Sequence, residues 1–172
     1  MTKEEIRQKN KELCEKYPFL IPSNRWSGMR ITEASEGGFW PGTPKAIPEY
    51  DYEHTELDDM PKGWRIAFGT EICDEIKEVL EAEGAMDKYR ITQIKEKYGQ
   101  LRWYSNYSSP AYHAIIEKYT KLSEKICIVC GKPATRITTW WISPYCDDCV
   151  PKEEKSSAVS VEEYLATNQC NE

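Results

Sequence analysis

Apolar residues recur at helical spacing along three stretches of the chain, residues 2–16, 70–83 and 111–126. In the first stretch, Thr2 and Glu5 stand at the two positions of a capping box, where each side chain bonds to the backbone N–H of the other residue. Polar and charged residues fill most of the remaining positions. The pattern predicts three amphipathic helices that each bury one face.

The residues at the ends of the second and third stretches set their expected limits. Thr70 is a suitable N-cap for the second helix, and a separate short helical turn is expected before it, at residues 63–68. Gly84 follows the last apolar residue of that helix, where a glycine commonly ends a helix. Ser109 and Pro110 supply an N-cap and a first helical residue for the third helix.

Other stretches have the residue types of β-strands. Residues 89–94 and 101–104 are rich in Tyr, Ile, Thr and Trp, and Gly99 lies between them, where a tight turn needs positive φ. Residues 134–142 are rich in Thr, Ile and Trp and predict a further strand. We therefore expect one β-hairpin before the third helix and a strand after it.

The strongest chemical pattern in the chain is a pair of Cys-x-x-C motifs. Cys127 and Cys130 form the first pair, Cys146 and Cys149 form the second, and fifteen residues separate the two pairs. This spacing is typical of a four-thiolate zinc site, in which two tight turns each direct two sulfur atoms at one tetrahedral ion. Because four protein ligands leave no open position on the metal, the pattern predicts structural rather than catalytic zinc.

Together these elements predict an α+β fold with three to four helices, a small antiparallel sheet or hairpin and a C-terminal zinc ribbon. We expect an α+β domain at residues 1–126, the ribbon at 127–150 and a polar tail at 151–172. Ser160 and Glu163 can cap a short helix in that tail. Within the ribbon, residues 140–142 (Trp-Trp-Ile) are expected to pack against the main domain.

Composition places the protein in the cytoplasm. Residues 1–5 carry no apolar segment of the kind that signal peptides contain, and no apolar run approaches the roughly 18 residues of a membrane helix. Zinc thiolates and free thiols persist in the cytosol, whereas disulfides are rare there. Cys14 and Cys73 lie on predicted helices, where we expect them to act as small buried apolar residues.

Charge is unevenly distributed along the chain, whose net charge is −6. Residues 51–83 carry eleven acidic and three basic side chains, and residues 84–136 carry four acidic and ten basic ones. An acidic block of this size can attract a basic protein partner, although most charge runs are only the solvated faces of helices. Residues 37–53 form an aromatic segment rich in Gly and Pro, which is a second candidate contact surface. The candidate partner-binding residues are Trp40, Tyr50, Tyr52, Glu71, Asp74, Glu75 and Glu78.

Nucleic-acid binding is the alternative function. Lys95, Lys97 and Arg102 alternate with aromatic residues such as Trp103 and Tyr104, as in proteins that bind single strands. The sequence pI of about 5.2 counts against this interpretation, because nucleic-acid-binding domains are generally basic. A purely structural explanation is also open, in which Trp103 packs in the core and the basic residues pair with the acidic helix.

One enzymatic pattern needs to be weighed. Residues 54–56 read His-Thr-Glu and residues 144–149 read Pro-Tyr-Cys-Asp-Asp-Cys, which approximates the zinc-deaminase motifs H-x-E and P-C-x-x-C. The extra Tyr145 breaks the second motif, and the match would leave Cys127 and Cys130 without a metal. We therefore expect a non-enzymatic protein.

Four stretches of the sequence resemble a known group as a set. They are residues 57–64 (LDDMPKGW), 89–104 (YRITQIKEKYGQLRWY), 127–134 (CIVCGKPA) and 141–149 (WISPYCDDC). Over residues 50–149 the chain resembles a group of small, uncharacterised zinc-ribbon proteins of bacteria, their phages and other mobile elements. The resemblance implies a zinc-containing accessory protein and supplies no activity.

Small acidic phage proteins include inhibitors of host defence, such as anti-CRISPR proteins. We therefore expect a zinc-stabilised protein, encoded by a phage or mobile element, that binds and inhibits or regulates a protein target. A host defence protein that binds nucleic acid would be such a target, because acidic side chains can imitate phosphate charge.

Overall fold

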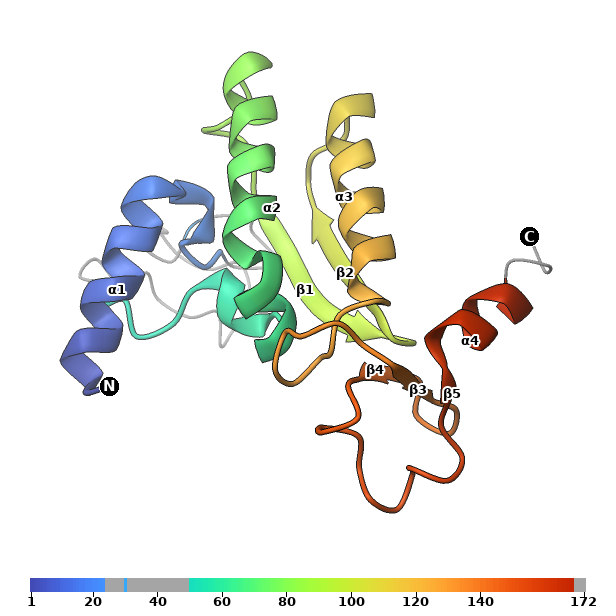
Figure 1. Cartoon of the computed structure of the whole chain (residues 1–172). Coiled ribbons are helices and arrows are strands. Elements are labelled where there is room, and N and C mark those ends of the chain that lie inside the picture. Colours follow the sequence, from blue (N-terminus) through green and yellow to red (C-terminus); the bar gives the residue numbers. More distant parts are fainter. Residues whose placement is uncertain (24–29, 31–49, 169–172) are drawn as a thin grey trace, which may run out of the picture.

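The computed structural model describes residues 1–23, 30 and 50–168, and it has the predicted α+β fold (Figure 1). In chain order the elements are α1 (Lys3–Lys16), η1 (Pro18–Leu20), η2 (Glu56–Asp59), α2 (Lys62–Ala82), β1 (Ile91–Lys97), β2 (Gln100–Ser105), α3 (Pro110–Ser123), β3 (Arg136–Thr138), β4 (Ser143–Tyr145), β5 (Val159–Ser160) and α4 (Val161–Asn168). The capping box of Thr2 and Glu5 and the N-cap of Ser109 are both present, as predicted.

The second helix differs from the prediction, because α2 is one continuous helix that begins at Lys62. No break separates residues 63–68 from the rest, and Thr70 lies inside the helix. Trp64, Phe68 and Ile72 explain this result, since they follow one another at intervals of four and are all buried. Burying three such side chains outweighs the cost of about 1 kcal/mol for each internal glycine.

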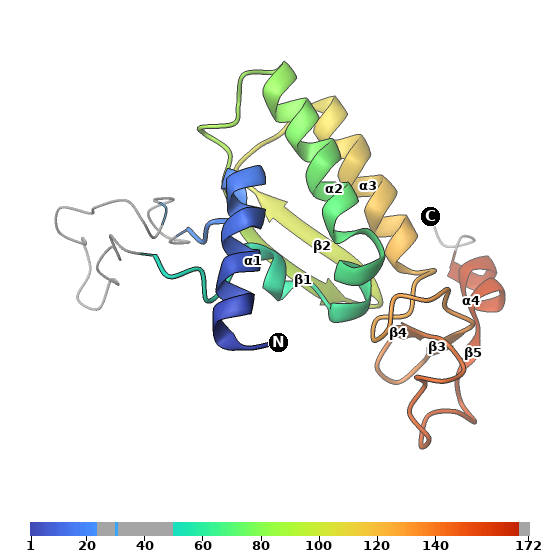
Figure 2. The ribbon, with the colours of Figure 1, turned by 60° about the vertical axis from the view of Figure 1, so that its left-hand side comes forward.

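The β1–β2 hairpin lies against α2 and α3, which run side by side over the same face of its two strands (Figures 1 and 2). Tyr98 and Gly99 form its two-residue turn, with φ values of 55° and 76°. A turn with two positive φ values matches the twist of the flanking strands. The strands extend to this turn from both sides and are therefore longer at that end than the sequence predicts.

Aromatic side chains fill the core between the hairpin and the helices. Trp103 is buried at the centre, and its indole N–H donates a hydrogen bond of 2.8 Å to the hydroxyl of Tyr89. The hydroxyls of Tyr89 and Tyr112 are 3.2 Å apart. Each polar atom that these rings bring into the core thus has a partner, which removes the cost of burying it. The interpretation of Trp103 as a core residue is confirmed.

Residues 127–168 form a second body, here called the C-terminal unit, that lies beyond one end of the hairpin (Figure 1). Its three-stranded antiparallel sheet has the order β4-β3-β5. The strand β5 comes from the polar tail, and the next helix, α4, has the Ser160 hydroxyl bonded to the backbone N–H of Glu163, as predicted. The expected strand at 134–142 is shorter, because the chain turns back after Thr138.

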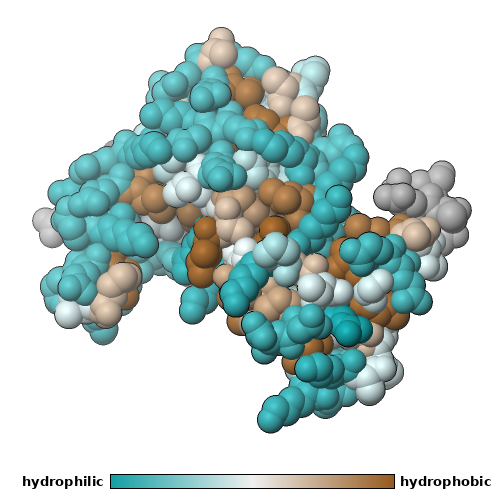
Figure 3. Space-filling model, in the orientation of Figure 1, coloured by the Kyte–Doolittle hydropathy of each residue, from teal (hydrophilic) through white to brown (hydrophobic). Residues whose placement is uncertain are grey.

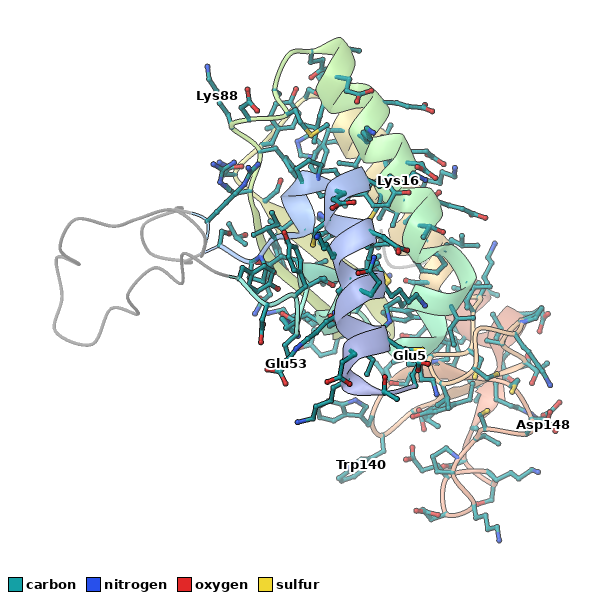
Figure 4. The ribbon with its side chains drawn as sticks, turned by 90° about the vertical axis from the view of Figure 1, so that its left-hand side faces the viewer. Glu5, Lys16, Glu53, Lys88, Trp140 and Asp148 are labelled. Carbon is teal, nitrogen blue, oxygen red and sulfur yellow. The ribbon has the colours of Figure 1, made fainter. Side chains whose placement is uncertain are left out.

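The two tryptophans of that turn do not pack against the main domain, contrary to the prediction. Trp140 is 93% exposed and Trp141 is 68% exposed. Figure 4 shows the Trp140 side chain pointing away from the protein backbone into solvent. Of the three residues expected to make the contact, Ile142 alone does so, because its Cγ2 methyl lies against Gly99 of the hairpin turn.

Candidate metal centre

The four motif cysteines lie in two tight turns that follow regular elements. Cys127 and Cys130 come shortly after α3, and the backbone N–H of Gly131 bonds to the carbonyl of Cys127 at 3.0 Å. Gly131 has a φ of 80°, a conformation that glycine adopts without strain. The second turn follows β4 directly, with the N–H of Cys149 bonded to the carbonyl of Cys146 at 3.0 Å.

These turns bring four sulfur atoms together. All four lie within 4.8 Å of one another, and the sulfurs of Cys130 and Cys146 are 3.6 Å apart. Cys127 and Cys146 are buried, whereas Cys130 and Cys149 are half-buried. One metal ion can therefore be held by one thiolate pair from each turn, as the spacing of the motifs predicts.

The thiols of the cluster differ in pKa because their surroundings differ. Burial raises the pKa of the Cys127 thiol, but backbone hydrogen bonds near Cys130 and Cys146 outweigh this effect and bring the pKa to about 7. A hydrogen bond with the Cys146 side chain, and partial burial after it, raises the pKa of the Cys149 thiol to about 12. A bound metal replaces these thiol protons, so metal binding releases protons.

The start of α2 contacts the first cysteine turn so closely that only glycine fits at position 63. A Cβ atom on Gly63 would lie 2.1 Å from the carbonyl oxygen of Cys127. The N–H groups of the first helical turn have no acceptor within their own helix. That of Gly63 donates instead to the carbonyl of Ile128 at 2.8 Å. The positive end of α2 also favours thiolate charge nearby. Sequence reasoning missed this role of Gly63, although a glycine in the first turn of a helix was a visible signal.

Other bonds join the two cysteine turns to each other and to the main domain. The N–H of Ile128 donates to the carbonyl of Pro144 in β4 at 2.9 Å. The indole N–H of Trp64 donates to the carbonyl of Ile126 at 3.0 Å, directly before the first cysteine. The cysteine cluster thus lies at the junction of α2, α3 and the C-terminal sheet.

The His-Thr-Glu segment lies apart from this centre. His54 faces Asp58 and Asp59, with ring nitrogens 3.8 Å and 3.5 Å from their carboxylates. Glu56 is buried and accepts a hydrogen bond from the N–H of Ser23 at 3.1 Å. The cysteines cluster with one another and not with His54, as the weak match to the deaminase motif predicts.

Two of the four candidate carboxylates of α2 bind other parts of this chain. Asp74 accepts hydrogen bonds from Lys16 at 2.8 Å and from the hydroxyl of Tyr17 at 2.7 Å. Glu75 accepts one from the hydroxyl of Tyr119 at 2.7 Å. These contacts hold α1 and α3 against α2, and hydrogen bonds to the charged form lower the pKa of Asp74.

The remaining candidates for partner binding are scattered. Glu71 and Glu78 are exposed on α2. Tyr50 and Tyr52 are half-buried, with ring centroids 5.0 Å apart, and the carbonyl of Tyr52 accepts a hydrogen bond from α1. Trp40 lies outside the described residues. The described candidates therefore do not form one continuous acidic and aromatic surface.

The three basic candidates, by contrast, share one face of the hairpin. Lys95 pairs with Arg102 across the two strands, and Lys97 follows Lys95 on the same face. None of the three forms an ion pair with a carboxylate of the part of the chain that the structure describes. The ammonium of Lys95 lies 5.6 Å from the centroid of the Tyr104 ring. Within the described residues, these three cations therefore do not pair with the carboxylates of α2, whereas Lys118 of α3 does pair with Glu75.

Comparisons of the chain with protein-family models, with curated proteins and with solved structures gave no match. Among the described helices, none has both the length and the apolar character needed to cross a bilayer. In the space-filling view, hydrophilic residues cover the outward faces of the helices, and hydrophobic ones show mainly between elements and on the C-terminal unit (Figure 3).

Proposed function

We propose that this protein is a zinc-stabilised, non-enzymatic binding protein. The observation that carries the proposal is the closed cluster of four cysteine sulfurs within 4.8 Å of one another. Four protein ligands fill a tetrahedral ion, so the metal would fold the C-terminal unit and would not hold a substrate. Its position beside Gly63 means that the same ion would also fix this unit against the main domain.

Zinc is the ion that fits this donor set best. Zinc–sulfur bonds of about 2.3 Å in a tetrahedron place the sulfurs about 3.8 Å apart. The distance of 3.6 Å between Cys130 and Cys146 is close to that value. Soft thiolate ligands favour zinc and iron over magnesium or calcium, so metal analysis must separate the first two.

Metal content of the purified protein tests this part of the proposal. We expect inductively coupled plasma mass spectrometry to find one zinc ion per chain. We expect that ion to be lost in Cys146→Ser and in Cys149→Ser. Cys14→Ala is the matched control, because Cys14 is a buried thiol outside the cluster. Stoichiometric iron, or zinc that persists in both serine variants, would overturn the assignment.

The target that we propose for this binding protein is another protein, which it inhibits or regulates in a phage or mobile-element setting. The exposed carboxylates of Glu71 and Glu78 support this proposal, since no contact within the described residues occupies them. Capture from a host lysate treated with nuclease is the test. We expect a partner that is retained by the wild type and by Glu4→Lys on α1 but lost in the double variant Glu71→Lys, Glu78→Lys. Equal capture by all three proteins would reject the acidic surface.

A further inference from the structure

Two turns from different parts of the chain meet where the hairpin borders the C-terminal unit (Figure 1). The hairpin turn at Tyr98 and Gly99 touches the β3–β4 turn, because a Cβ atom on Gly99 would lie 3.0 Å from Cγ2 of Ile142. Three exposed aromatic residues lie next to this contact in the sequence. They are Tyr98, which is 65% exposed, Trp140 and Trp141. The place where the two turns meet therefore presents three large aromatic rings to solvent.

The β3–β4 turn holds its tryptophans outward through a buried hydroxyl. Thr138 is 0% exposed, and its hydroxyl donates to the carbonyl of Trp141 and accepts from the N–H of Ser143 at 3.2 Å. Ile142 fixes the other side of the turn on the hairpin. Because the turn is anchored at both ends, it holds the two tryptophans in solvent, where a ligand can contact them. Exposed apolar groups of this kind commonly mark binding sites.

Three cations that form no ion pair within the described residues lie on the hairpin strands that lead to this place. Lys95, Lys97 and Arg102 occupy the hairpin face that leads to the turn, and the ammonium of Lys97 lies 5.2 Å from the centroid of the Tyr98 ring. Two basic residues of the C-terminal unit differ, since Lys132 pairs with Asp148 at 3.5 Å and Arg136 with Asp147 at 3.1 Å. The positive charge of the hairpin face is thus left for an external anion.

We propose that this surface binds a single strand of nucleic acid. The tip surface consists of Tyr98, Trp140, Trp141, Lys95, Lys97 and Arg102. Bases would stack on its rings, and phosphates would lie along its cations. The proposal rests on the proposed zinc-stabilised fold, because the metal centre holds the ribbon that carries the two tryptophans.

Single strands fit the arrangement better than other anionic partners. In a duplex the faces of the bases are stacked on one another, so the rings would have nothing to bind. An anionic membrane calls for a continuous apolar surface, whereas here the rings lie in two turns and the cations lie on the neighbouring hairpin strands. The net charge of −6 does not contradict the proposal, because residues 51–83 carry eleven acidic and three basic side chains, whereas residues 84–136, which include the hairpin, carry four acidic and ten basic ones.

Fluorescence anisotropy of labelled oligonucleotides tests the proposal with the zinc-loaded full chain. The probes are oligo(dT) and oligo(U) of about 15 nucleotides, together with a duplex of equal length. We expect the single strands to bind more tightly than the duplex. We also expect Trp140→Ala with Trp141→Ala to weaken single-strand binding about 10-fold or more, whereas replacement of both by Phe preserves most of it.

Salt dependence tests the cations separately from the rings. We expect Lys97→Ala and Arg102→Ala each to reduce the slope of log K against log salt by about 0.7, the value for one single-strand phosphate contact. Lys11→Ala, which removes an exposed cation from α1, is the control and should leave the slope unchanged. Equal slopes for all these proteins would overturn the proposal.

Three further results would also overturn it, and each is separable from failure of the proposed function. The first is no binding of either single strand at low salt by protein that carries one zinc ion. The second is duplex binding that the tryptophan variants do not alter. The third is binding to vesicles of phosphatidylglycerol and phosphatidylcholine without binding to oligonucleotides. In each case the zinc content shows that the stabilised fold is intact, so only the proposed ligand is rejected.

Discussion

The main domain and the C-terminal unit are held together by different forces. In the main domain, apolar and aromatic side chains such as Trp64, Tyr89 and Leu80 are completely buried in one continuous cluster. In the described part of the C-terminal unit, the buried apolar side chains other than cysteine are Ile137, Pro144, Val150 and Val161. The first body folds by burying surface, and the second has too little surface to bury.

This difference explains why the four candidate metal ligands lie in the C-terminal unit. A small body cannot offset the entropy of ordering its backbone with so few apolar contacts. Four metal–sulfur bonds would supply the missing free energy, and they would do so only when the ligands are brought together by folding. The comparison therefore predicts which changes damage one body and which damage the other.

Removal of the metal should have the largest effect and should be confined to the C-terminal unit. Zinc binding contributes on the order of 10 kcal/mol in small zinc domains, more than this unit can replace. After chelation, or in Cys146→Ser, we expect hydrogen exchange to become fast at Ile137 in β3 while Ile94 in β1 stays protected. Loss of protection in both strands together would show that the two bodies fold as one.

Replacing one tryptophan in each body compares the effects of the same substitution on the stability of the two bodies. Trp64 is 0% exposed and Trp140 is 93% exposed. Trp64→Ala should lower the free energy of unfolding by about 3–5 kcal/mol, because it leaves a cavity and an unpaired carbonyl at Ile126. Trp140→Ala should change it by less than about 0.5 kcal/mol. Urea denaturation followed by circular dichroism measures both, and a large loss in Trp140→Ala would contradict its exposed position.

The sequence predicted most of the fold because its local patterns are strong. The capping residues Thr2 and Ser109 and the hairpin turn at Gly99 act within a few positions of themselves, so they can be recognised without the tertiary structure. The four cysteines were predictable for a similar reason, since zinc chemistry fixes their spacing.

The features that the sequence did not reveal depend on contacts between distant segments. The role of Gly63 exists only because Cys127 approaches it from 64 positions away in the chain. Trp140 and Trp141 have the composition of a strand, but the bonds of Thr138 and the contact of Ile142 with Gly99 accompany a turn of the backbone there. Whether Lys95 is paired could be decided only once the positions of the acidic residues were known.

Two glycines of α2 provide a sharper test of the contact between the bodies. Gly63→Ala would place a methyl group 2.1 Å from the carbonyl of Cys127, so one body must move. We expect a loss of about 1–3 kcal/mol in unfolding free energy and weaker retention of zinc against a chelator. Gly69→Ala meets first the flexible side chain of Arg65 at 3.2 Å and should be neutral or stabilising through its higher helix propensity. Equal effects of the two substitutions would argue against the close approach at Gly63.

The smallest expected effect concerns the ion pair that joins α1 to α2. The hydrogen bond from Lys16, and then that from Tyr17, lowers the pKa of the Asp74 carboxyl below its ordinary value. The folded-state pKa is therefore below the unfolded one. Asp74 stabilises the fold at pH values above its ordinary pKa of about 4, and this contribution is lost as the pH falls through the lowered value.

Because Asp74 is about half exposed, its contribution should be below about 1 kcal/mol. Acid would also protonate the cysteine thiolates and release a bound zinc ion, so the free energy of unfolding of the wild type at low pH would report on both bodies. The difference in unfolding free energy between the wild type and Asp74→Asn cancels the zinc contribution, since both proteins have the same metal site. This difference should be largest at neutral pH and should shrink towards zero in strong acid. A difference that stays constant across that range would mean that the charge of Asp74 contributes nothing and that its hydrogen bonds alone hold α1 in place.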